Sequence, residues 1–231
     1  MCIVSSPAMS THGGAVRGII KHLMLFGVKG SWILGTRILT AKVKSRLSPR
    51  NWSGPFYSIE QVSNSFGIPY HYVAKVTGRK FHELLDRYKP DLLISISCPQ
   101  IIDREIRDRI PMGCVNVHGS PLPKYRGLMP SFWVLRNGEK TTAATVHDLR
   151  AKLDDGEILV QREVKILPED TWDSLVDKTK AEGVKALIEA VRKIEQGTAV
   201  RRPNKEKDAT YFSFPSSEDR KEFIKAGRKF F

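Results

Sequence analysis

Two polar side chains interrupt an otherwise apolar stretch of the chain, CVNVH, at positions 114–118. In a β-strand, residues two apart point to the same face, so Asn116 and His118 would lie together, with Val115 and Val117 on the opposite face. An Asn amide can donate to a developing oxyanion, and an imidazole can accept a proton near neutral pH. The turn sequence GSPLP follows and leaves this pair at the end of the strand. The spacing therefore indicates a candidate site that handles an oxyanion and a proton.

A second polar stretch, LDDG at positions 153–156, follows another predicted strand and supplies carboxylates that could orient or charge-balance an imidazole. Structural roles compete with this interpretation, because a strand His is often a hydrogen-bonded core residue and an Asn before a turn is often a cap. Cys114 shares a face with His118, but its position deep in an apolar strand disfavours a Cys/His nucleophile. A metal site built from His118, His147 and an Asp is disfavoured as well, since these residues form no close ligand pair.

The elements that must position these residues follow from the hydrophobic pattern. Apolar runs of strand length alternate with amphipathic runs of helix length, which predicts an α/β fold. We expect a Rossmann-like, largely parallel sheet with helices on both faces. In such sheets the ligand site lies at the carboxyl ends of the strands, so the loops SCPQII and GSPLPKYRG should meet at one edge. The predicted strands are 2–7, 91–97, 113–118, 141–149 and 157–166, and the predicted helices are 15–27, 30–47, 58–67, 80–90, 101–110, 130–138 and 171–197.

The last part of the chain differs in character. Residues 201–231 contain a polar linker, an aromatic patch and the sequence SSEDRKEF, which is a typical capped helix start. This segment is too small for a domain. We therefore predict a main domain over residues 1–200 and a C-terminal arm over residues 201–231.

The charge distribution favours anionic partners. The formal net charge is +13, and no acidic residue precedes Glu60. Such a basic block favours nucleic acid, phosphorylated metabolites or a membrane surface, although a solvated basic face explains it equally well. An acid-free start can also imitate a transit peptide, but the segment reads as part of the fold. With three cysteines lacking a paired spacing and no apolar run long enough to span a bilayer, we expect a soluble, cytoplasmic protein.

The two polar stretches together resemble the family of N10-formyltetrahydrofolate-dependent formyltransferases. The family pattern reads Asn-x-His-x-Ser-x-Leu-Pro, then Arg-Gly or a variant, and later Asp-x-Gly. The resemblance extends from about residue 58 to residue 197, and the segments THGG and YFSFP resemble one bacterial subgroup. The matching residues are Asn116, His118, Ser120, Leu122, Pro123, Arg126, Gly127, Asp154 and Gly156.

This resemblance implies a role for each matched residue. Asn116 and His118 would hold the tetrahedral intermediate formed when an amine attacks the formyl carbon. Asp154 would orient His118 and help to remove the proton of the amine, and no metal is needed. The pterin of N10-formyltetrahydrofolate would lie against the backbone after the strand 91–97, under the loop 148–153. The implied folate-binding residues are Cys98, Pro99, Gln100, Ile101, Ile102, Asp148 and Leu153.

The identity of the amine acceptor depends on weaker signals. Methionyl-tRNA formyltransferases carry an additional OB-type domain, for which too few residues follow Gly197. Purine-pathway members usually have Pro-Gly where this chain has Arg126 and Gly127. These signals favour an amino-sugar nucleotide as the acceptor, with methionyl-tRNA or glycinamide ribonucleotide as alternatives. The basic N-terminal segment keeps tRNA open as a partner, and a homodimer is compatible with the sequence.

Three departures from the family pattern support a rival hypothesis. Arg150, Ala151 and Lys152 replace a small or acidic stretch, and Asp155 stands where Thr or Gly is common. The first βα unit of the family has no counterpart, so we expect an N-terminally short catalytic domain, either truncated or with a true start further upstream. The rival hypothesis is an inactive formyltransferase-like protein that binds an anionic partner.

Overall fold

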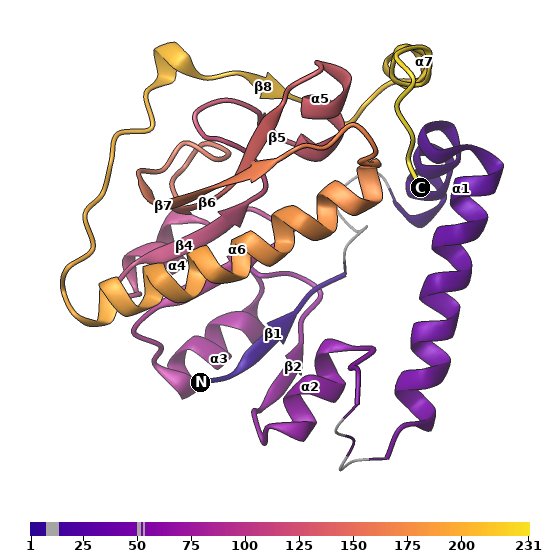
Figure 1. Cartoon of the computed structure of the whole chain (residues 1–231). Coiled ribbons are helices and arrows are strands. Elements are labelled where there is room, and N and C mark those ends of the chain that lie inside the picture. The colour runs from indigo at the N-terminus through magenta and orange to yellow at the C-terminus, as the bar shows by residue number, and fades with distance from the viewer. Residues whose placement is uncertain (8–13, 50–51, 53) are drawn as a thin grey trace. The chain divides into compact units, whose positions relative to one another are not determined.

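The computed structural model shows a mixed α/β protein (Figure 1). Its contacts divide the chain into two compact units. The N-terminal unit comprises Met1–Pro90 and Cys98–Ile101, and the C-terminal unit comprises Asp91–Ser97 and Ile102–Phe231. The predicted boundary at residue 200 stays a prediction. The residues that the structure describes are 1–7, 14–49, 52 and 54–231.

The N-terminal unit pairs two short parallel strands and carries three helices. The long helix α1 has non-helical backbone at Gly27, where φ is 69°, so two predicted helices meet at this residue. Helix α2 begins as predicted, because the Ser58 side chain accepts a hydrogen bond from the Gln61 backbone N–H. Residues 11–13 of the THGG motif lie outside the described residues. The elements are β1 (Ile3–Ser5), α1 (Gly14–Leu47), α2 (Ile59–Ser65), β2 (Tyr70–Tyr72) and α3 (Arg79–Tyr88).

The C-terminal unit is built on a mixed four-stranded sheet with the strand order β3-β4-β6-β7. Only β3 and β4 are parallel, whereas β4–β6 and β6–β7 are antiparallel. The α/β class is thus confirmed, but this sheet is not largely parallel, because β6 and β7 are joined by a short connection without the helical crossover that a parallel pair needs. The strands are β3 (Leu93–Ile96), β4 (Cys114–His118), β5 (Arg126–Gly127), β6 (Thr141–Asp148), β7 (Ile158–Lys165) and β8 (Tyr211–Phe212), and the helices are α4 (Arg104–Asp108), α5 (Pro130–Arg136), α6 (Trp172–Glu195), η1 (Glu206–Asp208) and α7 (Ser217–Lys225).

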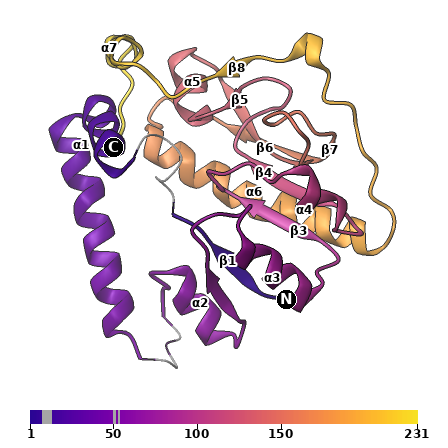
Figure 2. The same cartoon turned by 180° about the vertical axis from the view of Figure 1, so that it is seen from behind.

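Helix α6 forms the core of this unit with the sheet. It lies across β6 and β7 in both views (Figures 1 and 2). Its apolar face and the inward-facing residues of the strands form one buried cluster, so the helix fixes the strands that carry the polar residues. The cluster contains Val115, Val146, Leu159, Val160, Ala186, Ala190 and Ile194.

The C-terminal arm, residues 201–231, packs on the same unit. Strand β8 pairs in parallel with β5, with Arg126 opposite Tyr211 and Gly127 opposite Phe212. Helix α7 starts at a capping box formed by Ser216 and Asp219, as its sequence predicts. The arm therefore contributes a strand beside the loop that follows β4. No helix among the described residues is both long and apolar enough to cross a lipid bilayer.

Candidate active site

The C-terminal unit brings the three predicted catalytic residues together. Strand β4 carries Asn116 and His118, and the connection between β6 and β7 carries Asp154. The Nδ1 atom of His118 lies 3.6 Å from Oδ2 of Asp154. On the other side of the carboxylate, Nε2 of His147 lies 3.5 Å from Oδ1. Asn116, His118, His147 and Asp154 thus form one group around a single carboxylate, which we call the polar cluster.

His118 is positioned to accept a proton on Nδ1. Its Nε2 atom lies 2.8 Å from the carbonyl oxygen of Tyr125, which can only accept, so Nε2 carries the ring proton. Burial lowers the pKa of His118 below its ordinary value, although the Asp154 carboxylate and the Tyr125 carbonyl favour the protonated ring. The ring is therefore neutral near pH 7, with its Nδ1 lone pair facing Asp154.

Asp154 is a buried carboxylate that stays ionised. The residue is 7% exposed, and Oδ2 accepts a hydrogen bond of 2.9 Å from the backbone N–H of Gly127. Burial alone would raise the pKa of Asp154, but the two histidines and the Gly127 N–H outweigh burial and lower this pKa below its ordinary value. The cluster therefore holds a fixed negative charge next to an uncharged imidazole, which is a favourable place for a transferred proton.

His147 is the member of the cluster whose role the sequence pattern does not indicate. Its Nδ1 donates to the Asp148 carbonyl at 2.9 Å, and its Nε2 accepts from Nδ2 of Asn116 at 3.2 Å. The amide of Asn116 has two N–H groups, and the second remains for a bound ligand. The relevant signal is the pairing of Asn116 with His147 across β4 and β6, a register that a single sequence does not contain.

Two glycines allow the backbone to approach closely enough to form the cluster. A Cβ atom on Gly156 would lie 1.7 Å from the carbonyl oxygen of Asp148. A Cβ atom on Gly127 would lie 2.2 Å from the carbonyl oxygen of Phe212, and Gly127 has a φ of 101°. Neither position can accept a larger side chain without movement of the backbone. The Asp-x-Gly and Arg-Gly motifs thus have a geometric reason in this fold.

The residues of the predicted folate-binding loop are divided between the two units. Residues Cys98–Ile101 belong to the N-terminal unit and Ile102 to the C-terminal unit. The Gln100 side chain binds its own unit, accepting from the N–H of Val76 and donating to the carbonyl of Ala74, both at 3.1 Å. Ile101 is 68% exposed, whereas Ile102 is buried. Their contribution to folate binding stays a prediction.

The other two predicted folate residues are Asp148, the last residue of β6, and Leu153, in the connection between β6 and β7. The carboxylate of Asp148 accepts from Nε of Arg201 at 2.8 Å, so this side chain is engaged within the protein. Leu153 is 51% exposed and presents an apolar side chain at the surface, directly before the buried Asp154. Of the two, Leu153 has the side chain that a ligand could contact.

The rival chemistries gain no support. Burial raises the pKa of the Cys114 thiol to about 11, so the nucleophilic thiolate is scarce at neutral pH. Within the described ranges, no group of three His, Cys, Asp or Glu residues is arranged to hold a metal ion.

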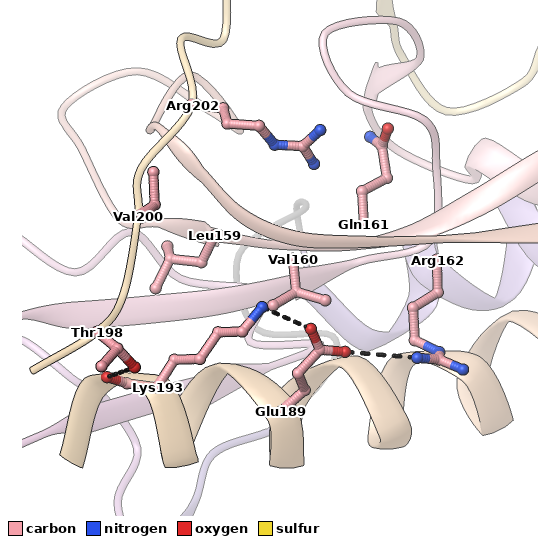
Figure 3. Close-up of a pocket in the computed structure, with 9 residues that line it drawn as sticks. All are labelled: Leu159, Val160, Gln161, Arg162, Glu189, Lys193, Thr198, Val200 and Arg202. Atoms are coloured by element: carbon pink, nitrogen blue, oxygen red, sulfur yellow. Dashed lines mark hydrogen bonds and ion pairs between the residues drawn. The ribbon is translucent and has the colours of Figure 1, made fainter. Parts of the chain in front are cut away.

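A separate pocket of about 450 Å³ lies at the edge of the sheet, where residues 198–202 pass strand β7 (Figure 3). On the helix side, Glu189 accepts from Lys193 at 2.7 Å and from Arg162 at 3.4 Å, which leaves its charge balanced. The side chains of Gln161 and Arg202 point to the opposite side of β7. No predicted site residue lines this pocket. Its lining residues are Leu159, Val160, Gln161, Arg162, Glu189, Lys193, Thr198, Val200 and Arg202.

Comparison with known proteins identifies sequence relatives of this chain. Residues 57–191 match the profile of the Formyl transferase family. A methionyl-tRNA formyltransferase from Agathobacter rectalis is 34% identical over 160 residues, which cover 69% of this chain and 52% of the relative. A second methionyl-tRNA formyltransferase, from Acetivibrio thermocellus, is 40% identical over 138 residues, covering 60% of this chain and 44% of the relative. The chain spans about half the length of these curated relatives.

A solved structure shows that the fold is shared. The formyltransferase PseJ from Anoxybacillus kamchatkensis, crystallised with UDP-4,6-dideoxy-4-formamido-L-AltNAc and tetrahydrofolate, aligns with a TM-score of 0.58. The alignment covers 74% of this chain and 87% of PseJ, at 24% identity. At this level of identity the similarity concerns the fold alone.

Proposed function

Because this chain belongs to the formyl transferase family, we propose that it transfers a formyl group from N10-formyltetrahydrofolate to a primary amine. The observation that carries this proposal is the polar cluster, in which an uncharged His118 and an ionised Asp154 lie 3.6 Å apart beside an Asn116 with a spare N–H group. Formyl transfer needs this combination of an oxyanion donor and one proton acceptor.

The residues of the cluster divide this work. The spare N–H of Asn116 stabilises negative charge on the formyl oxygen. His118 would take the proton of the attacking amine on Nδ1, with the Asp154 carboxylate stabilising the imidazolium. The bond between the formyl carbon and N10 of the donor would then break, and the imidazolium would return the proton to N10 as tetrahydrofolate leaves. His147 holds the Asn116 amide in place through the 3.2 Å contact between Nε2 and Nδ2.

The donor, when bound, supplies an electrophilic formyl carbon. The exposed apolar side chain of Leu153 is chemically suited to the flat face of a pterin. In contrast, the Asp148 carboxylate is already paired with Arg201. We therefore expect Leu153 to contact the folate and Asp148 to support the loop from within.

For the amine acceptor, we propose methionyl-tRNA as the first candidate. The support is the identity of 34–40% to two methionyl-tRNA formyltransferases. The acid-free basic segment before Glu60 suits a polyanionic substrate as well. An acceptor of this kind would make formylation strongly dependent on salt concentration.

An amino-sugar nucleotide is the second candidate. Part of its support in the sequence was Arg126, but this side chain is 0% exposed and lies within a hydrogen-bond network of the protein itself. It has no surface to offer a substrate. The second candidate therefore loses this support.

The test is a formyl-transfer assay with N10-formyltetrahydrofolate and three acceptors: methionyl-tRNA, an amino-sugar nucleotide panel and glycinamide ribonucleotide. We expect turnover with one acceptor, a fall in kcat of about 100- to 1,000-fold for Asn116→Ala, and a fall of about 100- to 10,000-fold for Asp154→Asn. Lys185→Ala, on the exposed face of α6, is the matched control and should retain full activity. A folded protein that binds no folate and transfers no formyl group would favour the inactive, anion-binding alternative.

A further inference from the structure

The C-terminal arm contacts the backbone of the turn that carries Asp154. Asn204 lies in the arm, and its Nδ2 donates to the carbonyl oxygens of Asp154 and Gly156, each at 2.8 Å. Its Oδ1 accepts from Nη2 of Arg126 at 2.8 Å. One side-chain amide therefore uses both of its N–H groups on the Asp154 turn and its oxygen on strand β5.

Arg126 holds the arm in this position. Its guanidinium donates to Glu206 and, at 2.7 Å, to the hydroxyl of Tyr211, and it lies 5.3 Å from the centre of the Tyr211 ring. The Arg126 side chain is fully buried, and a buried charge that loses its partners is strongly destabilising. Separating the arm from β5 would therefore leave the buried Arg126 guanidinium without its partners in the arm.

Strand β5 and the residue directly before it carry the two backbone groups that bind His118 and Asp154. The Tyr125 carbonyl accepts from His118, and the Gly127 N–H donates to Asp154. On the other edge of the same segment, the N–H of Tyr125 donates to the Thr210 hydroxyl at 2.8 Å, and the N–H of Arg126 donates to the Thr210 carbonyl at 2.9 Å. The position of the arm therefore sets the positions of both backbone groups.

We propose that Asn204 is a positioning residue for formyl transfer. It ties the Asp154 turn to Arg126 and β5, so that the carboxylate of Asp154 faces Nδ1 of His118. This inference rests on the proposed function, because its catalytic effect requires the His118–Asp154 pair to handle a proton. Asn204 touches neither imidazole and acts only through the backbone of residues 154–156.

A merely structural role would have a different signature. Asn204 does not belong to the buried apolar cluster beneath the sheet. Loss of its three hydrogen bonds should therefore leave α6 and the sheet folded while the Asp154 turn moves. Displacement of a catalytic group by about 1 Å can lower the rate about 100-fold. We therefore expect substitution of Asn204 to lower kcat, with little change in KM or in the unfolding midpoint.

The experiment compares Asn204→Asp with Lys207→Ala, an exposed position on the same arm. Asn204→Asp keeps an oxygen for Arg126 and removes both donors to the turn. We expect its kcat to fall about 10- to 100-fold, the KM values to stay within about twofold, and Lys207→Ala to match the wild type. Asn204→Ala, which loses the acceptor as well, should be at least as impaired. An Asn204→Asp variant with wild-type kcat, or one whose loss only follows loss of folded protein, would overturn the proposal.

A second readout does not depend on activity. The backbone amide of Gly127 donates to Asp154, so its proton resonance reports the position of the carboxylate. We expect this resonance to shift in Asn204→Asp and to stay unchanged in Lys207→Ala. If the wild type transfers no formyl group, the proposed function fails, yet this resonance still tests the positioning by Asn204. An unchanged Gly127 resonance in Asn204→Asp would contradict the positioning role of Asn204.

Discussion

The connection between β6 and β7 has two halves that differ sharply. Residues 150–153 are exposed, and Arg150 forms an ion pair with Glu157 at 2.8 Å. The next three residues include the buried Asp154 and Gly156, whose backbone carbonyls both bind Asn204. Four residues of one loop thus face solvent, while the following turn contacts β4, β5, β6 and the C-terminal arm.

This difference indicates that the two halves of the connection have different roles. The turn at Asp154 is preorganised, so that charge and proton acceptor are in place before a ligand arrives. The side chains of the exposed half are not packed against the protein, so they are free to cover a bound ligand. The sequence departures from the family pattern at positions 150–152 fall in the exposed half. Substitutions in the two halves should therefore have effects of different size and kind.

The largest effect is expected at Gly156. In Gly156→Ala the new Cβ would lie 1.7 Å from the Asp148 carbonyl oxygen, so the turn must open and Asp154 must leave His118. We expect a loss of at least about 3 kcal/mol in the free energy of unfolding together with loss of formyl transfer. Chemical denaturation followed by circular dichroism measures the stability.

The control for this prediction is Gly35→Ala. A Cβ on Gly35, within α1, meets nothing within 4 Å, and alanine favours a helix by about 1 kcal/mol. This variant should be neutral or slightly more stable. Equal stability of Gly156→Ala and the wild type would show that the turn is not held as tightly as its contacts imply.

An intermediate effect is expected from pH. The pKa of His118 is lowered from 6.5, and that of Asp154 from 3.8. Within each interval between the folded and the ordinary pKa, the unfolded chain binds more protons than the folded chain, so stability falls as pH falls. We expect unfolding midpoints to decline below pH 6.5 and again below pH 3.8.

Comparison with His118→Gln tests the upper interval. This variant lacks the titrating ring, so its decline below pH 6.5 should be shallower than that of the wild type. Identical pH profiles for the two proteins would exclude His118 as the source of the decline.

The smallest effect is expected in the exposed half. Leu153→Ala removes apolar surface that we expect to contact folate, so the KM for N10-formyltetrahydrofolate should rise by a few-fold, corresponding to about 1 kcal/mol. The kcat and the unfolding midpoint should be unchanged. Lys152→Ala is the neighbouring control and should match the wild type. A large loss of kcat in Leu153→Ala would contradict the prediction that the exposed half affects only the binding of folate.

Local features of the fold could be predicted from the sequence, because their signals are local. The capped starts of α2 and α7 and the strand character of 114–118 depend on residues within a few positions of one another. The common face of Asn116 and His118 follows from the two-residue period of a strand. The pairing direction of the strands could not be predicted in this way, and the sheet is accordingly mixed where a largely parallel one was expected.

The remaining part of the site depends on contacts between distant segments. His147 enters the cluster because β6 pairs antiparallel with β4, which places it opposite Asn116. Arg126 resembled a determinant of substrate choice, but the structure buries it against residues 204–211 of the arm. Both contacts join residues far apart in the sequence. A sequence motif can therefore identify the residues but cannot show which residues they contact.

The parallel pairing of β5 with β8 also sets an order of assembly during synthesis. Domains form from the N-terminal end as the chain leaves the ribosome. The sheet and α6 are complete by Glu195, but the partners of Arg126 extend to Tyr211. A nascent chain can therefore reach a folded sheet with its catalytic turn still untethered. If the proposed function is correct, competence for formyl transfer would arise only after the arm has emerged, later than the folding of the sheet.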